Sequence, residues 1–256
     1  MIEAVPQELK GRVDELTQEP VIVWLRPGRG ARGPAAGVSH AELAAAAVGV
    51  ADRSGLGAVS MRQVAKELGV GQSSLYRYVS SREDLLDLMT DAAAGETDLG
   101  VPLRGDPVED LLDLALRTRA VQLRHPWLTD IPPEPLRLGP CGLAYLEYAL
   151  RAMESVRLPG PAKLEALAVM NALIAQFVRT EAGNTPASSG RRAAQAAYLN
   201  GAAAQGNHPR LAAALAERVE GEGVTEAGTT EDDPPGRFRR TMRRVLDALV
   251  TPGNRA

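Results

Sequence analysis

The sequence has a single cysteine, Cys141, and only nine aromatic side chains among its 256 residues. A lone cysteine cannot close a disulfide within the chain, which excludes a small secreted scaffold held together by such bonds. Because aromatic residues are scarce, a hydrophobic core has to be built mainly from Leu, Ala and Val. Hydrophobic residues still make up 45% of the chain and charged residues 24%, which is typical of a folded globular protein.

Long apolar runs are also missing. The longest one, at residues 43–50, is far shorter than the roughly 18–20 residues that cross a bilayer. Residues 1–4 lack the basic and apolar segments with which a signal peptide begins. We therefore expect a cytoplasmic protein with no membrane partner.

No charge of one sign dominates, since 29 Lys and Arg stand against 32 Asp and Glu and leave a net charge of -3. Taken over the whole chain, this balance argues against a nucleic-acid partner. A local concentration of basic residues would reverse that argument, because phosphate contact depends on the charge of one surface.

Good helix formers dominate the composition of the chain, and alternating strand patterns bounded by hairpin turns are absent. The sequence therefore predicts an all-α fold. Three regions follow from composition and periodicity: an N-terminal extension at residues 1–38, a block of short helices at residues 39–95, and a larger helical region at residues 96–256.

The N-terminal extension combines three different patterns. Apolar residues at helical spacing predict a short helix over residues 7–18, and residues 20–25 form an apolar run that is either a strand or an anchor packed on the body. Residues 26–34 then read as a flexible Gly/Pro/Arg arm with Arg26, Arg29 and Arg32 and no acidic residue.

Serines that can cap helices recur through residues 39–95. Ser39 precedes the first helix, Ser60 precedes the second with Gln63 placed to complete a capping box, and Ser80 or Ser81 precedes the fourth. The expected helices run over residues 40–53, 61–68 and 71–79, and from residue 82 onward.

Proline and glycine divide the region from residue 96 onward into further helices. The expected helices run over residues 107–123, 139–158, 161–182, 209–219 and 235–250, with surface loops at residues 183–186 and 221–233.

A helix-turn-helix unit is predicted from the apolar spacing of two of these helices. Val64 and Leu68 lie on one face of the first helix, Gly69 supplies the tight turn, and Leu75 and Val79 repeat four residues apart on the second. The second helix opens with small polar residues that fit a DNA major groove.

Basic residues concentrate in this same unit. Between Ser60 and Arg82 there are four basic side chains and one acidic one, which leaves a net charge of +3, and the three arginines of the arm would raise it to +6. This local charge is what phosphate contact requires, whatever the sum over the chain.

Two stretches of the unit are specific: they read GLGAVSMRQVAKELGV at residues 55–70 and SLYRYVSSREDLL at residues 74–86. This combination resembles the TetR family of bacterial transcriptional regulators. The resemblance implies an N-terminal helix-turn-helix three-helix DNA-binding domain at residues 39–95 and a larger helical ligand-binding and dimerisation domain at residues 96–256. In the second region, residues 125–128 (His-Pro-Trp-Leu) and the helix at residues 238–249 resemble the tetracycline-repressor-like subgroup.

The resemblance assigns DNA contacts to nine residues: Ser60, Arg62, Gln72, Ser73, Ser74, Tyr76, Arg77, Tyr78 and Arg82. Of these, Gln72 to Ser74 match positions that read base edges, and Arg77 would read a guanine or clamp a phosphate. The hydroxyls and the other arginines suit phosphate oxygens. Gly71 heads the recognition helix without a side chain and so reads no base, and one of the two tyrosines is expected to pack partly between helices.

The N-terminal extension with its basic arm is unusual for the TetR family, which is compact. Its arginines, Arg26, Arg29 and Arg32, could enter the adjacent minor groove, or the segment could be no more than a solvated linker. The glycines at Gly28, Gly30 and Gly33 lack the strand-to-helix context of a dinucleotide-binding loop.

A small organic effector is expected in the second region, where rare aromatic and amide side chains gather on the central helices. The candidate pocket residues are His125, Trp127, Tyr145, Tyr148, Asn171, Gln176 and Phe177. Plain core packing is the alternative for each of them.

A homodimer on a pseudo-palindromic double-stranded DNA operator is the expected assembly, because one helix-turn-helix covers too little DNA for tight specific binding. The helices at residues 163–179 and 238–250 are the candidate dimerisation surfaces. The alternatives are a helical enzyme or binding protein with a vestigial helix-turn-helix, and a ligand-independent activator.

Residues for other chemistry are not apparent. His40, His125 and His208 lack partners at metal-ligand spacing, and Cys141 has no paired base that would make it a nucleophile. We therefore expect no metal, no cofactor and no enzymatic activity.

Overall fold

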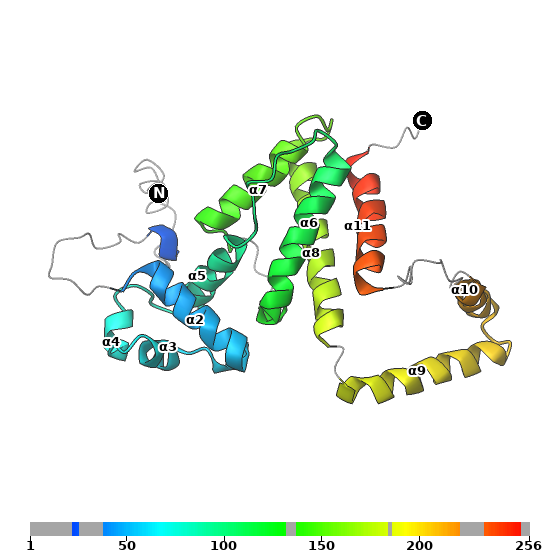
Figure 1. Ribbon diagram of the computed structural model, residues 1–256, viewed down its shortest axis with the longest axis horizontal. Helices are drawn as coiled ribbons and strands as arrows, with labels where there is room; N and C mark the ends of the chain where they lie inside the picture. Colours follow the sequence, from blue (N-terminus) through cyan, green and yellow to red (C-terminus); the bar gives the residue numbers. More distant parts are fainter. Residues whose placement is uncertain (1–21, 26–37, 132–136, 184–185, 221–232, 252–256) are drawn as a thin grey trace. The chain divides into compact units, whose positions relative to one another are not determined.

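The computed structural model describes residues 22–25, 38–131, 137–183, 186–220 and 233–251. Every element within these ranges is a helix, in agreement with the predicted all-α fold, and none of the described residues forms a strand (Figure 1). The predicted helix over residues 7–18, the basic arm at residues 26–34 and most of the loop at residues 221–233 lie outside the described ranges.

The chain divides into two compact units. One comprises Met1–Gly105 with Arg117–Ser155, and the other comprises Asp106–Leu116 with Val156–Ala256. The helix α6 (Pro107–Arg124) therefore contributes residues to both. This division follows packing, and the functional boundary between residues 95 and 96 stays a prediction.

Three helices of the first unit begin at serine caps, where the sequence places them. Ser39 accepts the N–H of Glu42 and Ser81 accepts that of Asp84, and each carboxylate accepts the N–H of its serine to complete a capping box. For Ser60 the structure has only the first of these two bonds, so its predicted capping box is half formed. Each cap stabilises its helix by about 1 kcal/mol.

The helix-turn-helix consists of α3 (Met61–Glu67) and α4 (Gln72–Leu75). Gly69 adopts a φ of 67°, a left-handed conformation that glycine takes without steric cost and that makes the tight turn possible. The second helix is shorter than the predicted range of residues 71–79. After Leu75 the chain tightens into a turn in which two successive N–H groups, of Tyr78 and Val79, donate to the same Leu75 carbonyl.

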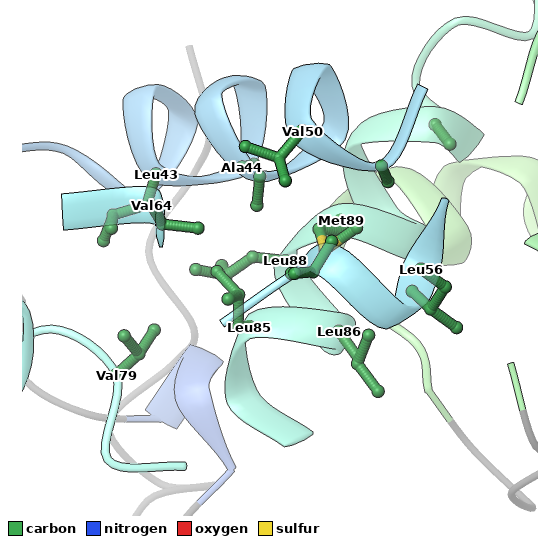
Figure 2. Packing of buried hydrophobic residues seen from close by; sticks show 14 of the residues in the cluster. Leu43, Ala44, Val50, Leu56, Val64, Val79, Leu85, Leu86, Leu88 and Met89 are labelled. Atoms are coloured by element: carbon green, nitrogen blue, oxygen red, sulfur yellow. The ribbon is translucent and has the colours of Figure 1, made fainter. Parts of the chain in front are cut away.

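Leucine and small apolar side chains from three helices form the core beneath this motif. Leu43 and Val50 of α2 (His40–Ser54) face Leu85 and Met89 of α5 (Arg82–Ala94), and Val64 of α3 belongs to the same cluster (Figure 2). All five are buried, and truncating one such leucine to alanine typically costs about 2–5 kcal/mol. The core thus fixes α3 on the pair formed by α2 and α5.

Two further elements of the first unit come after α6. Pro126 ends α6 as expected and opens a short helix, η3 (Pro126–Asp130), and α7 (Pro140–Ala152) follows. The buried carboxylate of Asp91 on α5 accepts the N–H groups of Cys141 and Gly142. These two groups lie in the first turn of α7 and have no partner within the helix. The structure ends α7 at Ala152, before the predicted limit at residue 158.

The apolar run at residues 20–25 is an anchor in its described part, because Val23–Leu25 forms a short helical turn and not a strand. Val23 is fully buried and packs with the core residues of α2 and α5. Trp24 stacks edge-on against His40 with ring centroids 6.4 Å apart. This described part of the N-terminal extension therefore lies beside the first residue of α2.

The second unit is built on a pair of long helices, α8 (Gly160–Ala182) and α11 (Pro234–Val250). Phe177 and Phe238 meet edge-to-face with centroids 5.2 Å apart, and Met242 and Leu246 extend the buried side of α11. Both helices match their predicted ranges within one residue.

Two helices, α9 (Pro186–Ala204) and α10 (Pro209–Glu220), follow in the same unit and pack on each other. α10 was expected, but α9 lies where the sequence analysis predicts no helix. Residues 190–201 are all exposed, so α9 has no apolar stripe to reveal it and depends on the helix propensity of its alanines.

Candidate nucleic-acid interface

The apolar side of the helix-turn-helix faces the core and leaves its polar side outward. Val64, Ala65, Leu75 and Val79 are all buried. Since these residues fix the orientation of both helices, the intervening polar side chains of α3 and α4 are directed away from the core.

Seven of the nine predicted DNA-contacting residues are exposed, and Ser74 and Tyr78 are half-buried. The exposed ones are Ser60, Arg62, Gln72, Ser73, Tyr76, Arg77 and Arg82. The structure therefore brings a set of groups that suit base edges and phosphates onto the surface of one small motif.

The two tyrosines differ as expected. Tyr76 is 53% exposed, and its hydroxyl accepts a long hydrogen bond, 3.4 Å, from the amide of Gln72 one turn earlier. Tyr78 instead packs its ring against the core of the unit. Tyr76 is thus the tyrosine with its hydroxyl fully on the surface.

Two of the predicted contacts also have structural roles. The Ser60 oxygen accepts the Gln63 N–H at 3.2 Å, which leaves its hydroxyl hydrogen able to donate to a phosphate. Arg82 lies 3.5 Å from the Leu56 carbonyl, a long contact that leaves most of its donors unused.

An ion pair that was not predicted from the sequence joins α3 of the motif to α2. Arg53, near the end of α2, donates to Glu67 of α3 at 2.6 Å. Both side chains are more than a third exposed, so the pair adds little stability but favours one orientation of α3 on α2. The two residues are 14 positions apart along the chain, which leaves no local signal of this pairing.

The predicted effector residues fall into separate groups. In the first unit, the Tyr148 hydroxyl donates to the Val101 carbonyl at 2.8 Å, and Arg117 lies over the Tyr148 ring while donating to its oxygen. Thr118 is 3.5 Å from the Tyr145 hydroxyl. These contacts join α6 and α7 through a polar, aromatic cluster.

Asn171, Gln176 and Phe177 lie on α8 in the second unit. Gln176 is exposed, Asn171 is half-buried, and Phe177 packs on Phe238. Their assignment to an effector pocket stays a prediction.

His125 and Trp127 have a different environment from the one expected of pocket residues. Both are buried and both bind Asp52 of α2: the His125 Nδ1 lies 2.7 Å from the carboxylate, and the Trp127 indole donates to the same oxygen at 2.7 Å. The other imidazole nitrogen, Nε2, lies 3.0 Å from Glu96. Asp52 and Glu96 are functional candidates that the sequence analysis missed, since they lie far from His125 along the chain.

Metal and thiol chemistry find little support. Within the described ranges no group of three or more His, Cys, Asp or Glu side chains could hold a metal ion. Burial, with the charge of Asp91 adding to it, raises the pKa of the Cys141 thiol, so the reactive thiolate is disfavoured.

Comparison with known proteins gives matches across most of the chain. A sequence model described as "Bacterial regulatory proteins, tetR family" matches residues 43–89, and one described as "Tetracyclin repressor-like, C-terminal domain" matches residues 100–231. The chain is 32% identical over 161 residues to the HTH-type transcriptional repressor DrrR1 of Streptomyces coeruleorubidus, which covers 62% of this chain and 60% of that protein.

A second relative matches over more of its length. An HTH-type transcriptional regulator of Saccharopolyspora erythraea is 31% identical over 194 residues, 75% of this chain and 81% of the relative. Among solved structures, ActR of Streptomyces coelicolor in complex with actinorhodin has a TM-score of 0.67 and 24% identity, over 86% of this chain and 100% of that one. The structural match supports the arrangement of helices alone.

Proposed function

Because the chain belongs to the TetR family of bacterial regulatory proteins, we propose that it is a homodimeric transcriptional repressor released from its operator by a small organic ligand. The observation that carries the proposal is the polar outer surface of α3 and α4, set on a buried apolar core. The regulators named among its relatives support the same role. They also support a DNA-binding protein of the cytoplasm that catalyses no reaction.

The recognition helix would read DNA with few side chains. Gln72 suits the adenine edge and Arg77 suits guanine or a phosphate, while Ser73 and Ser74 are short enough to let the backbone approach the groove. Tyr76, Arg62 and Arg82 would bind phosphates on either side and fix the register.

The basic arm would add contacts beside this surface. Val23 and Trp24 are fixed against the first unit at one end of the arm, and Ser39 caps α2 at the other. A segment held at both ends loses less entropy on binding DNA than a free tail does. Arg26, Arg29 and Arg32 are therefore proposed to bind the minor groove or its phosphates.

An effector would act on α6 and α7. The Arg117, Tyr145 and Tyr148 cluster offers a cation, two rings and hydroxyls to an aromatic, oxygen-rich molecule. The actinorhodin bound by ActR supports an organic effector of this general kind. Binding would favour a conformation whose recognition helices no longer fit the operator.

A gel-shift titration with the DNA upstream of the protein's own gene tests the proposal. Arg77→Ala is expected to weaken specific binding at least about tenfold, because a base contact contributes roughly 1–3 kcal/mol of discrimination. Arg157→Ala, which removes an exposed arginine of the second unit, is the matched control and should bind like wild type.

Wild-type binding should also weaken steeply with salt, as phosphate contacts require. An absence of sequence-specific binding by the wild-type protein would overturn the proposal. Specific binding that no extract of small molecules releases would favour the ligand-independent regulator instead.

A further inference from the structure

The imidazole of His125 is held between two carboxylates from different parts of the first unit. Its Nδ1 lies 2.7 Å from Asp52 Oδ1 at the end of α2, and its Nε2 lies 3.0 Å from Glu96 Oε1 just after α5. The His125 side chain is only 8% exposed. We define this group of three residues as the His125 bracket.

The geometry of the bracket depends on the charge of the imidazole. A neutral imidazole has one N–H and one lone pair, so it can donate to only one of two flanking carboxylates and must direct its lone pair at the other. The imidazolium donates to both, through charge-assisted bonds that are about twice as strong as neutral ones. The two acceptors at opposite nitrogens therefore select the protonated ring.

The surrounding charged groups favour the same state. On the α6 side Arg124 donates to the second oxygen of Glu96 at 2.7 Å, and on the α2 side Trp127 donates to Asp52. When His125 is protonated, the positive charges of His125 and Arg124 balance the negative charges of Asp52 and Glu96. Burial alone would lower the pKa of His125, but its hydrogen bonds to Asp52 and Glu96 and their negative charges outweigh burial and raise the pKa above its ordinary value.

The bracket joins the DNA-reading helices to α6. Asp52 directly precedes Arg53 in the chain, and Arg53 forms an ion pair with Glu67 of α3. His125 directly follows α6, a continuous helix of 18 residues that carries Arg117 of the proposed effector cluster. A shift at the end of α6 would therefore displace His125 and change its contact with Asp52 of α2.

We propose that Asp52, His125 and Glu96 form a protonation-controlled latch that positions the helix-turn-helix for operator binding, so that operator affinity falls when His125 loses its proton. This inference rests on the proposed function and adds a regulatory input to it. His125 acts here as a positioning residue, since it lies behind α2 and does not belong to the exposed polar surface.

The direction of the pH dependence follows from linkage. A group whose pKa is raised on folding stabilises the folded state fully below its unfolded pKa, about 6.5 for histidine, and this stabilisation is lost as the pH rises through the folded pKa. The latch is therefore closed in mildly acidic solution and opens toward alkaline pH. Because coupling is reciprocal, operator DNA should raise the pKa of His125 further.

NMR titration of the imidazole resonances tests the latch directly, since the chain has only three histidines. His125 should titrate above the ordinary histidine pKa of about 6.5, and Asp52→Asn should lower its midpoint. A wild-type His125 that titrates below that value would overturn the proposal without any DNA measurement.

Operator affinity against pH tests the functional part. From pH 6.5 to 8.5 the wild-type protein should lose about fivefold more affinity than His125→Gln, a typical size for coupling between sites, and the two should converge at the alkaline end. His208→Gln, which removes an exposed histidine of the second unit, is the matched control and should keep the wild-type profile.

If His125→Gln fails to fold, Glu96→Gln provides the same comparison. The Glu96 side chain is 40% exposed, and the substitution removes the negative charge from only one of the two carboxylates of the bracket. Parallel pH profiles of wild type and bracket variants on a specifically bound operator would overturn the latch and leave the proposed function intact. Absence of specific binding at every pH would instead count against the proposed function, with the imidazole titration still deciding the latch.

Discussion

At the scale of single residues, the tyrosines on either side of Arg77 divide between surface and core. Tyr78 packs on the apolar cluster, so replacing it would disturb the fold and binding together. The Tyr76 side chain is mostly exposed, and its hydroxyl has only a long hydrogen bond to Gln72. Tyr76 is therefore the position at which a proposed DNA contact can be removed without a change in packing.

Tyr76→Phe is expected to weaken operator binding about two- to tenfold per subunit, the effect of one lost hydrogen bond, with the thermal midpoint unchanged. Fluorescence anisotropy with labelled operator and a thermal melt measure the two quantities. Tyr198→Phe, which removes a hydroxyl from an exposed tyrosine of α9, is the matched control. Wild-type affinity for Tyr76→Phe would assign the phosphate contact elsewhere.

At the scale of the elements, the start of α7 depends on a glycine. A Cβ on Gly139 would lie 2.4 Å from Asp91 Cγ and 2.4 Å from Trp24 Cζ2, while its φ of -96° is open to any residue. Space, not backbone conformation, therefore requires glycine there. Gly139 therefore lies against both Trp24 and the carboxylate that accepts the first N–H groups of α7.

Gly139→Ala should lower the free energy of unfolding by about 1–3 kcal/mol, the usual cost of overpacking. Gly160→Ala at the start of α8 is the matched control, because nothing lies within 4 Å of its added Cβ, and its effect should stay within about 0.5 kcal/mol. Urea denaturation measures both. Equal stability of the two variants would show that Asp91 and Trp24 move aside easily.

Local signals explain which elements the sequence could predict. Ser39, Ser60 and Ser81 mark helix starts because a cap acts within three residues, and prolines and glycines delimit α8 and α11. α9 has neither a serine cap nor an apolar stripe that would mark it, and α4 is shortened by the turn at Leu75. The bracket was not predictable, because Asp52 and His125 are brought together by the packing of elements 73 residues apart.

At the scale of the whole molecule, the proposed function requires two copies of the chain. A single short recognition helix makes few base contacts, so specific affinity depends on two half-sites bound at once. On α8, Leu164 and Val169 are 48% and 45% exposed, although α8 packs on α11 through its other residues. α8 is also the one described helix long and apolar enough to cross a membrane by length and composition. A second copy of the chain packed on the exposed side of α8 would remove these apolar side chains from water.

Val169→Glu places a charge on the exposed side of α8 and is expected to convert the proposed dimer to a monomer, because burying an unpaired carboxylate costs several kcal/mol. Sedimentation equilibrium measures the change, and operator affinity should fall together with dimer content. Leu143→Glu is the matched control, since Leu143 is 58% exposed on α7 of the other unit and should leave the dimer intact. Since the helix-turn-helix core of Leu43, Val64 and Leu85 is separate from α8, the monomer should stay folded by circular dichroism and keep weak, salt-sensitive binding to a single half-site. A Val169→Glu protein that remains dimeric would remove α8 from the interface and leave α11, the other candidate surface, to test.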